Sequence, residues 1–399
     1  MKRNKSLRFV GALGTVVALG LSVLVTGGGS IATAGAATAK YKIALSLSYT
    51  GNDWQSEAAN LIKAEANTAP YKTLVSLHTD IAGSAVTAQI QTLQNEISAG
   101  YKAIIVYPIS PTALNATIQQ ACNAGIAVFA YDSLVTAPCA YNIHIDQYAW
   151  GLYNAGWLAK AMKGKGTIAD ISGVPGTTVD IDRQLGLQHV LAQNPGITIA
   201  GTSNGAWAQA QGLSAFESIF VAHPDITGIY AEAGCGTIET YLVSIKHALL
   251  PCAGEYENNT HLEYLSTALG GLGAQGSSAG SPVYSGELAL IDAVQVLQGK
   301  KIAHDTILPL PRIDSAQVTA LGAKAVGTNP TKGVVVFPAK LVTPGMFGDF
   351  WTPLVEQGLQ ANLHGTSDKI STPLPCAKVP GCKSQSHLIV DATHPGAGN

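Results

Sequence analysis

Polar and aromatic residues follow several apolar runs of this sequence, and their types suit the recognition of hydroxyl groups. Carboxylates, amides and hydroxyls exchange hydrogen bonds with a polyhydroxylated ligand, and aromatic rings cover its C–H surfaces. These types and positions predict a pocket for a small polyhydroxylated molecule. The candidate ligand-binding residues are Asn52, Asp53, Trp54, Tyr107, Asp132, Ser133, Thr178, Asp180, Arg183, Trp207, Glu232 and Glu255.

Strand-like and helix-like segments alternate from Tyr41 onward and give these residues their places. The run "AIIVY" (103–107) is typical of a buried strand, and "SAVTAQIQTLQNEISAG" (84–100) has apolar residues at helical spacing. Such alternation predicts βαβ units and a parallel sheet covered on both faces. Because ligands bind outside the carboxyl ends of parallel strands, we expect the polar residues after the strands to line one cleft.

Several candidates also have a purely structural explanation, and the sequence leaves both explanations open. An amide or carboxylate before a helix often serves only as an N-cap. A tryptophan at a helix start can belong to the core, and an arginine near carboxylates can form a structural ion pair. The residues concerned are Asn52 and Asp53 for capping, Trp54 and Trp207 for the core, and Arg183 with Asp180 or Asp182 for the ion pair.

The N-terminus has the pattern of an export signal. The basic stretch "MKRNKSLR" precedes the apolar stretch "FVGALGTVVALGLSVLV", and A-x-A sites ending at Ala36 and Ala39 follow. We expect residues 1–39 to be a cleaved signal peptide, with a retained membrane anchor as the alternative. Gly28 stands where a lipoprotein would carry its cysteine. We therefore expect a periplasmic or secreted protein without a lipid anchor.

Six cysteines fit an oxidising compartment. They allow fifteen pairings, and we favour sequential pairing because each bond would then close a short local loop. Since no C-x-x-C occurs, we expect no metal site. The disulfide candidates are Cys122 with Cys139, Cys235 with Cys252, and Cys376 with Cys382.

The alternating segments form two sets of similar size, which predicts an α/β protein of two doubly wound parallel-sheet lobes joined by a hinge. We assign 40–145 plus about 281–313 to the N-terminal lobe and 146–280 to the C-terminal lobe. Residues 314–399 are expected to be an extension that contributes to the lobes, with a strand at "GVVVFP", and ends in an irregular tail.

The chain is expected to cross between the lobes near residues 140–147 and again between about 255 and 282. The helix predicted over 286–301 is expected to pack back on the N-terminal lobe. In the second crossing, "GLGAQG" (271–276) matches G-x-G-x-x-G. It does not stand in a tight strand-to-helix turn, so we interpret it as a flexible connection and expect no cofactor.

Composition and motifs exclude several classes of protein. The net charge of −2 gives no basic face for nucleic acid, so no nucleic-acid partner is expected. The chain also lacks G-x-S-x-G, H-E-x-x-H and the Walker pattern. Its histidines are scattered without catalytic spacing. We therefore expect no enzyme activity.

Three stretches resemble the type I periplasmic sugar-binding proteins of ABC importers, the ribose-binding kind. They are "YKAIIVYPISPTALNATIQQACNAGIAVFAYDS", "ISGVPGTTVDIDRQLGL" and "FVAHPDITGIYAEAG", and the similarity covers roughly residues 40 to 310. The resemblance implies a type I periplasmic-binding-protein fold, a Venus flytrap that closes on one sugar-like molecule. Regulators with this fold carry a DNA-binding headpiece, whereas an export signal stands in its place here.

The resemblance also implies roles for single residues. Asn52 and Trp54 fall at the first-lobe amide and stacking aromatic, and Asp132 at the ligand-binding Asp that ends the fourth strand. Trp207 falls on a second-lobe stacking aromatic, and Glu255 near a ligand-binding Asp. The family arginine matched by Arg183 is taken as mainly structural.

Three positions depart from the family pattern. Ser133 and Ile181 stand where the family has arginines, and Ala233 stands where it has an amide. These changes remove polar contacts typical of ribose. They favour a more apolar or differently shaped ligand.

We therefore expect a monomeric extracytoplasmic solute-binding protein that captures a small sugar-like or polyol ligand and delivers it to the membrane permease of an ABC importer. One alternative is a ligand-sensing subunit that presents its closed form to a membrane receptor. Another is an exported carbohydrate-active enzyme, which needs two carboxylates facing each other across the cleft.

Overall fold

The computed structural model describes residues 39–255, 273–308, 310, 312–316, 327–329, 334–336 and 383–385. The predicted signal peptide lies, except for Ala39, outside the described residues, as do Cys376 and Cys382 and most of the predicted tail.

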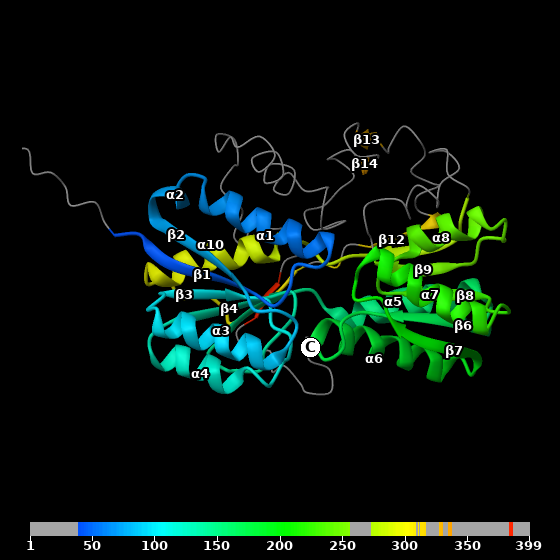
Figure 1. Cartoon of the computed structure of the whole chain (residues 1–399), viewed down its shortest axis with the longest axis horizontal. Coiled ribbons are helices and arrows are strands. Elements are labelled where there is room, and N and C mark those ends of the chain that lie inside the picture. The colour runs from blue at the N-terminus through cyan, green and yellow to red at the C-terminus, as the bar shows by residue number, and fades with distance from the viewer. Residues whose placement is uncertain are drawn as a thin grey trace, which may run out of the picture. The chain divides into compact units, whose positions relative to one another are not determined.

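The first sheet has the strand order β15-β11-β5-β4-β3-β1-β2 (Figure 1). Its neighbours pair in parallel except β11 and β15, which are antiparallel. All four residues of β3 are buried, as expected for a parallel sheet covered on both faces. The strands are β1 (Tyr41–Leu47), β2 (Val75–Ile81), β3 (Ala103–Val106), β4 (Ala127–Tyr131), β5 (Tyr141–His144), β11 (Asp305–Ile307) and β15 (Lys383–Gln385).

Helices cover both faces of the first sheet because successive strand residues point to opposite sides. Ile43 and Leu45 pack with α1 and α10, whereas Ala44 and Ile104 pack with α3 and α4. These helices are α1 (Asp53–Ala66), α3 (Val86–Ser98), α4 (Asn115–Asn123) and α10 (Ser285–Leu297). The contacts of α10 with α1 and β4 confirm that this helix packs back on the first lobe.

The second sheet has the order β12-β10-β9-β8-β6-β7, with β12 antiparallel to β10 and the other pairs parallel. On one side, α5 and α6 pack closely, and a Cβ on Gly186 would come within 2.7 Å of the Gly151 Cα, so glycine is needed there. The strands are β6 (Lys165–Ser172), β7 (Gly196–Asn204), β8 (Gly228–Ala231), β9 (Cys252–Glu255), β10 (Gly276–Ala279) and β12 (Arg312–Asp314). The helices are α5 (Gln147–Ala161), α6 (Thr178–Gln193), α7 (Gln209–Ala222) and α8 (Cys235–Ser244).

The two lobes of parallel α/β sheet agree with the predicted fold class, but some element predictions were wrong. The segment "YKTLVSLH" (71–78) has the pattern of one strand, but its first four residues form a helical turn, α2 (Tyr71–Leu74), because Pro70 before it already has helical backbone angles. The short strands β5 and β10 lie in segments interpreted as connections. In β10 the small residues Gly-Ser-Ser-Ala have little intrinsic strand preference. This segment forms a strand because it packs against α5 and pairs with β9.

The predicted residue limits of the two lobes stay predictions. The sheet topology differs from them at one point, the end of the first lobe. Strand β12 belongs to the second sheet, although the first lobe was expected to extend to about residue 313. In the predicted extension, β13 (Gly327–Asn329) pairs with β14 (Val334–Val336), which falls within the strand predicted at "GVVVFP".

Two disulfides occur among the described residues, and both follow sequential pairing. Cys122–Cys139 joins the end of α4 to the segment before β5, and Cys235–Cys252 joins the start of α8 to β9. Each spans a sequence separation of 17 residues. A loop of that length restricts the unfolded chain enough to stabilise the fold by about 3 kcal/mol.

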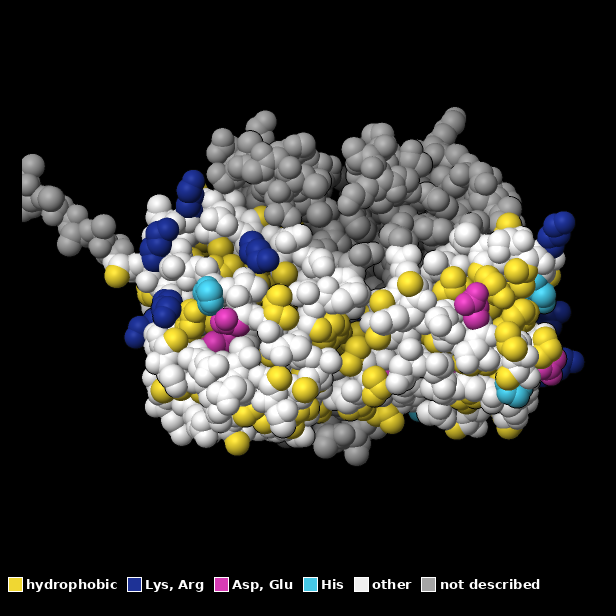
Figure 2. All heavy atoms as spheres, viewed as in Figure 1, with side chains coloured by type: hydrophobic (Ala, Val, Ile, Leu, Met, Phe, Trp, Pro, Cys, Tyr) yellow, Lys and Arg dark blue, Asp and Glu magenta, His cyan; other side chains and the backbone are white. Residues whose placement is uncertain are grey.

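Charged side chains are sparse on the face shown in Figure 2, in agreement with a charged fraction of 12%. Among the described residues, no helix combines the length and the apolar character that crossing a bilayer requires.

Candidate functional site

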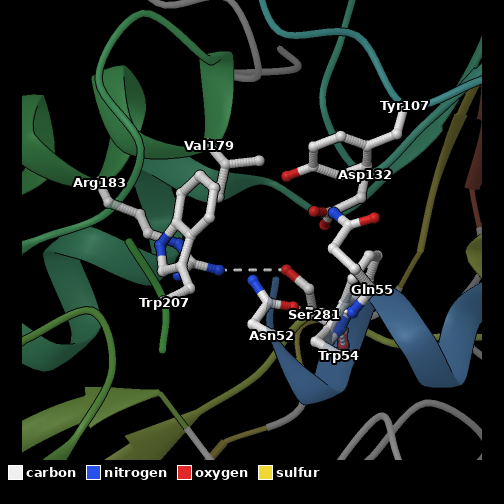
Figure 3. A pocket seen from close by; sticks show the side chains of 9 residues that line it. All are labelled: Asn52, Trp54, Gln55, Tyr107, Asp132, Val179, Arg183, Trp207 and Ser281. Atoms are coloured by element: carbon white, nitrogen blue, oxygen red, sulfur yellow. Dashed lines mark hydrogen bonds between the residues drawn. The ribbon is translucent and has the colours of Figure 1, made fainter. Parts of the chain in front are cut away.

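A cavity that is partly open to solvent lies where side chains of both lobes and of the segment before α10 meet (Figure 3). The empty space among its lining residues, together with the solvent at its mouth, is about 250 Å³. The cavity is lined by Asn52, Trp54, Gln55, Tyr107, Asp132, Val179, Arg183, Trp207 and Ser281.

The N-terminus of α1 supplies one wall of the cavity. Asn52 is the N-cap of this helix, and its Oδ1 accepts a hydrogen bond of 2.8 Å from the Gln55 backbone N–H. The Trp54 indole N–H donates to the Ser281 carbonyl oxygen at 2.8 Å. Capping and cavity lining thus occur together at Asn52. Asp53 is the first residue of α1, and its side chain lies outside what the structure describes.

The polar turn after β3 places Tyr107 in an aromatic cluster beside the cavity. Its ring lies 5.9 Å from that of Tyr49, 5.6 Å from that of Tyr131 and 6.0 Å from that of Trp54. Gln89 fixes this turn, because its Nε2 donates to the Tyr107 carbonyl and its Oε1 accepts from the Ile109 N–H. Burial raises the pKa of Tyr107 well above its ordinary value, so the phenol stays neutral.

Asp132 follows β4 and carries the carboxylate of the first lobe. Its φ of 60° lies in the left-handed region, which is strained for a residue other than glycine. The backbone N–H donates to the Ile143 carbonyl at 2.8 Å, and Oδ1 accepts from Gln147 Nε2 at 3.0 Å. The surrounding structure therefore fixes this carboxylate at the cavity.

Trp207 lies on the opposite side of the cavity, in the second lobe (Figure 3). Its φ is 52°, and its indole N–H donates to Glu232 Oε2 at 2.9 Å. A Cβ on Gly173 would overlap the indole ring, so glycine is required beneath it. Glu232 is fully buried behind the ring and does not line the cavity. Burial raises the pKa of Glu232 well above its ordinary value, and the nearby Asp180 adds to the rise.

Arg183 on α6 connects the second lobe with the hinge. Its Nε donates to Gln147 Oε1 at 2.9 Å. Its Nη2 donates to Ser281 Oγ at 3.1 Å, the bond that Figure 3 marks. The guanidinium carbon lies 4.1 Å from the centre of the Trp150 ring. The Glu232 Oε2 atom lies 3.8 Å from Arg183 Nη1. Burial raises the pKa of Asp180, and Arg183 counteracts this rise electrostatically, so the predicted pairing of Arg183 with Asp180 or Asp182 stays a prediction.

Ser133 and Thr178 face each other across the lobes instead of lining the cavity. Their hydroxyl oxygens lie 3.3 Å apart, and Thr178 Oγ1 accepts a hydrogen bond of 2.8 Å from the Leu134 N–H. Asp180 also points elsewhere, since its Oδ1 accepts from the Gly173 N–H at 2.8 Å. Glu255 ends β9, and its side chain is not among those described.

Residues 43–301 match the family described as "Periplasmic binding protein domain". The chain belongs to this family. This periplasmic binding protein is 25% identical over 248 residues to a xylitol-binding protein of Mycolicibacterium smegmatis, covering 59% of this chain and 68% of that protein. It is 24% identical over 276 residues to the ribose import binding protein of Bacillus subtilis, covering 68% and 86%. The resemblance to type I periplasmic sugar-binding proteins is thereby confirmed.

Solved structures with the same fold support the two-lobe architecture. An ABC transporter solute-binding protein from Mycobacterium smegmatis with bound glycerol gives a TM-score of 0.62 at 22% identity, covering 74% of this chain and 99% of that chain. The fructose-binding periplasmic domain of a hybrid two-component system gives 0.60 at 18% identity, covering 70% and 92%. The family and its relatives are binding proteins, so this protein is not an enzyme. The family also implies an extracytoplasmic location.

Sequence reasoning missed three lining residues of this periplasmic binding protein: Gln55, Val179 and Ser281. Gln55 is one helical turn from the N-cap Asn52, and this spacing is a usable signal. Val179 gave none, because an isolated valine in a helix usually indicates core. Ser281 lies in the second crossing, where only its place in the fold makes it part of a site.

Proposed function

We propose that this periplasmic binding protein captures one small, uncharged sugar or polyol between its lobes and delivers it to the membrane permease of an ABC importer. The observation that carries the proposal is the cavity lined from both lobes and the hinge. It combines amides, one carboxylate and aromatic rings, a set that suits hydroxyl groups and C–H surfaces. The relatives named for xylitol and ribose import support the same class of ligand.

The proposed mechanism is closure of the lobes on the ligand. A ligand that touches both lobes binds the closed form better and shifts the population toward it. Asn52 and Asp132 would hold the ligand from the first lobe and Trp207 from the second. The closed form is what a permease recognises in this proposal. We further propose that the protein is a monomer, exported by a cleaved signal peptide and not lipid-anchored.

Ligand sensing is a second candidate function. The similar fold of a fructose-binding domain of a two-component system shows that this fold also occurs in a sensor. Uptake of a labelled ligand by cells that lack the protein separates the two candidates. Loss of uptake supports transport, whereas unchanged uptake with loss of ligand-induced gene expression supports sensing.

The test of binding is a thermal shift of the chain from Lys40 against sugars, polyols and other small metabolites. A ligand that binds only the folded state raises the melting temperature, and at 100 times its Kd it adds about 2.7 kcal/mol of stability. A shift with a sugar or polyol is the expected result. A folded protein that shifts with no sugar or polyol, but with a metabolite of another class, would contradict the proposed function.

A further inference from the structure

We propose that the ligand presents a hydrocarbon face to the second lobe and its hydroxyl groups to the first lobe and the hinge, as a deoxy sugar does. This inference rests on the proposed function and narrows its ligand class. The observation behind it is that the polar side chains of the cavity, apart from Arg183, lie on one side.

Apart from Arg183, the second-lobe wall of the cavity is apolar. Val179 and Trp207 form it, and Ala233 and Val174 pack with them into one hydrophobic cluster that also contacts Tyr49. Figure 3 shows the Val179 side chain directed across the cavity toward Tyr107. A ligand closed between the lobes therefore meets methyl groups and a ring on this side.

Trp207 offers the ligand only its ring. Its one polar atom, Nε1, already donates to Glu232 at 2.9 Å, and Glu232 is fully buried behind it. The overlap that any Cβ on Gly173 would produce shows how closely the ring is packed from behind. The indole can therefore stack on C–H groups, but its N–H is not available to a hydroxyl.

Arg183 is the remaining second-lobe residue that lines the cavity, and two of its donors bond to the hinge, while Nη1 lies 3.8 Å from the buried Glu232 Oε2. Nε and Nη2 donate to Gln147 and Ser281, and the guanidinium stacks on the Trp150 ring. A ligand hydroxyl against Val179 and Trp207 would lose its hydrogen bonds to water without replacement there. A methyl or methylene group at the same place loses nothing.

Hydrogen-bonding groups gather on the other side of the cavity. Asn52 and Gln55 come from the first turn of α1, Asp132 from the end of β4, and Ser281 from the hinge. Figure 3 shows the first-lobe side chains opposite Val179 and Trp207. A molecule with one polar edge and one hydrocarbon face matches this division.

Matched pairs of sugars that differ by one hydroxyl test the proposal by isothermal titration calorimetry on the exported protein. The pairs are D-fucose and D-galactose, L-rhamnose and L-mannose, and 2-deoxy-D-ribose and D-ribose. We expect the deoxy member of at least one pair to bind at least about tenfold tighter. Equal or tighter binding of the hydroxylated member in every pair that binds overturns this inference and leaves the proposed function standing. Binding of a metabolite of another class, with no binding of these six sugars, of xylitol or of any other sugar or polyol in the thermal-shift panel, overturns both.

Substitutions in the second-lobe wall test whether this wall causes the preference for the deoxy sugar. Val179→Thr adds a hydroxyl at almost constant shape and is expected to reduce the preference at least about threefold. The matched control is Val190→Thr, on the same helix but away from the cavity, which should leave the preference unchanged. Val179→Ala, which keeps the wall apolar, should weaken both members of a pair alike. An unchanged preference in folded Val179→Thr overturns the assignment of this wall.

Discussion

At Asp132, an unfavourable backbone conformation and a cavity-lining carboxylate occur in one residue. The left-handed φ of 60° is held by the bond from its N–H to the Ile143 carbonyl, and Gln147 holds the carboxylate. Strained conformations of this kind occur preferentially at functional sites, because the surrounding structure must stabilise them. We therefore regard Asp132 as the first-lobe residue on which ligand binding depends most.

Replacement of Asp132 tests this role. Hydrogen bonds to a charged group contribute about 1.5–3 kcal/mol each, so Asp132→Ala should abolish detectable binding of the ligand. Asp132→Asn tolerates the left-handed conformation and should weaken binding at least about tenfold. Calorimetric titration measures both effects, with circular dichroism to verify folding. The exposed Asp225→Asn is the matched control. Wild-type affinity in folded Asp132→Ala would remove the residue from the site.

The structure brings side chains that come directly after strands to the cavity. Tyr107 and Asp132 could be placed there from the sequence because the carboxyl end of a parallel strand has a known place in the fold, whereas their role in binding stays a prediction. The same rule selected Ser133, the residue after Asp132, but the Ser133 side chain points to Thr178 and not into the cavity. The direction of a side chain in such a turn depends on the backbone angles of the turn. The sequence does not give those angles.

At the scale of elements, the N-terminus of α6 joins the lobes. Thr177 caps the helix. Thr178 Oγ1 accepts a hydrogen bond from the Leu134 N–H and lies 3.3 Å from the Ser133 hydroxyl oxygen. The residues that make these contacts are all buried: Ser133, Leu134, Thr177 and Thr178. The structure thus includes a direct hydrogen bond between the first and second lobes, which we expect to belong to the closed form.

Loss of this bond should favour the open form. Thr178→Val keeps the shape but leaves the Leu134 N–H without its acceptor, at a cost of about 1–2 kcal/mol in the closed form. The ligand should then bind roughly tenfold more weakly, with faster dissociation, because the competent population falls. Stopped-flow dissociation and small-angle scattering measure the two effects. Thr73→Val, at an exposed helix turn of the first lobe, is the control. Unchanged dissociation and an unchanged radius of gyration would contradict this role.

The repeated alternation of strands and helices was sufficient to predict the two lobes, whereas the hinge was not predictable. Strands β5 and β10 are only four residues long, and their pairing depends on neighbours far away in the chain. The hinge residues Gln147 and Ser281 are 134 positions apart and meet at 2.9 Å. Contacts over such separations arise from the completed fold and leave no local pattern.

At the scale of the whole molecule, several carboxyl groups are buried although the chain has few charges. Burial raises the pKa of Glu96 on α3 and of Asp182 on α6 to about 8. It also raises the pKa of Glu65 to about 8. The pKa of His144 is also raised. Burial alone would lower it, but Asp305 at 3.0 Å and the Ile145 carbonyl raise it.

The raised pKa values of the carboxyl groups and of His144 have the same effect on stability: each lowers the free energy of unfolding as the pH rises. A carboxyl group with a raised folded-state pKa ionises in the unfolded chain from about pH 4.5 upward, while the folded protein keeps its proton, so stability falls as the pH rises toward 8. A histidine with a raised pKa contributes stability below its ordinary pKa and loses that contribution as the pH rises through the folded value. The free energy of unfolding should therefore decrease between pH 5 and pH 8.

Calorimetric melting across this pH range measures the decrease. One pKa unit corresponds to about 1.4 kcal/mol, and each kcal/mol to about 2–4 °C, so we expect Tm at pH 8 to lie at least about 5 °C below that at pH 5. Glu96→Gln removes one buried ionisable group and should raise Tm at pH 8 more than at pH 5. Asp225→Asn, which replaces an exposed carboxylate, should leave the pH dependence as it is. A Tm that rises from pH 5 to pH 8, or an equal effect of Glu96→Gln at both values, would mean that these carboxyl groups are ionised in the folded protein, with their charges compensated by neighbouring groups.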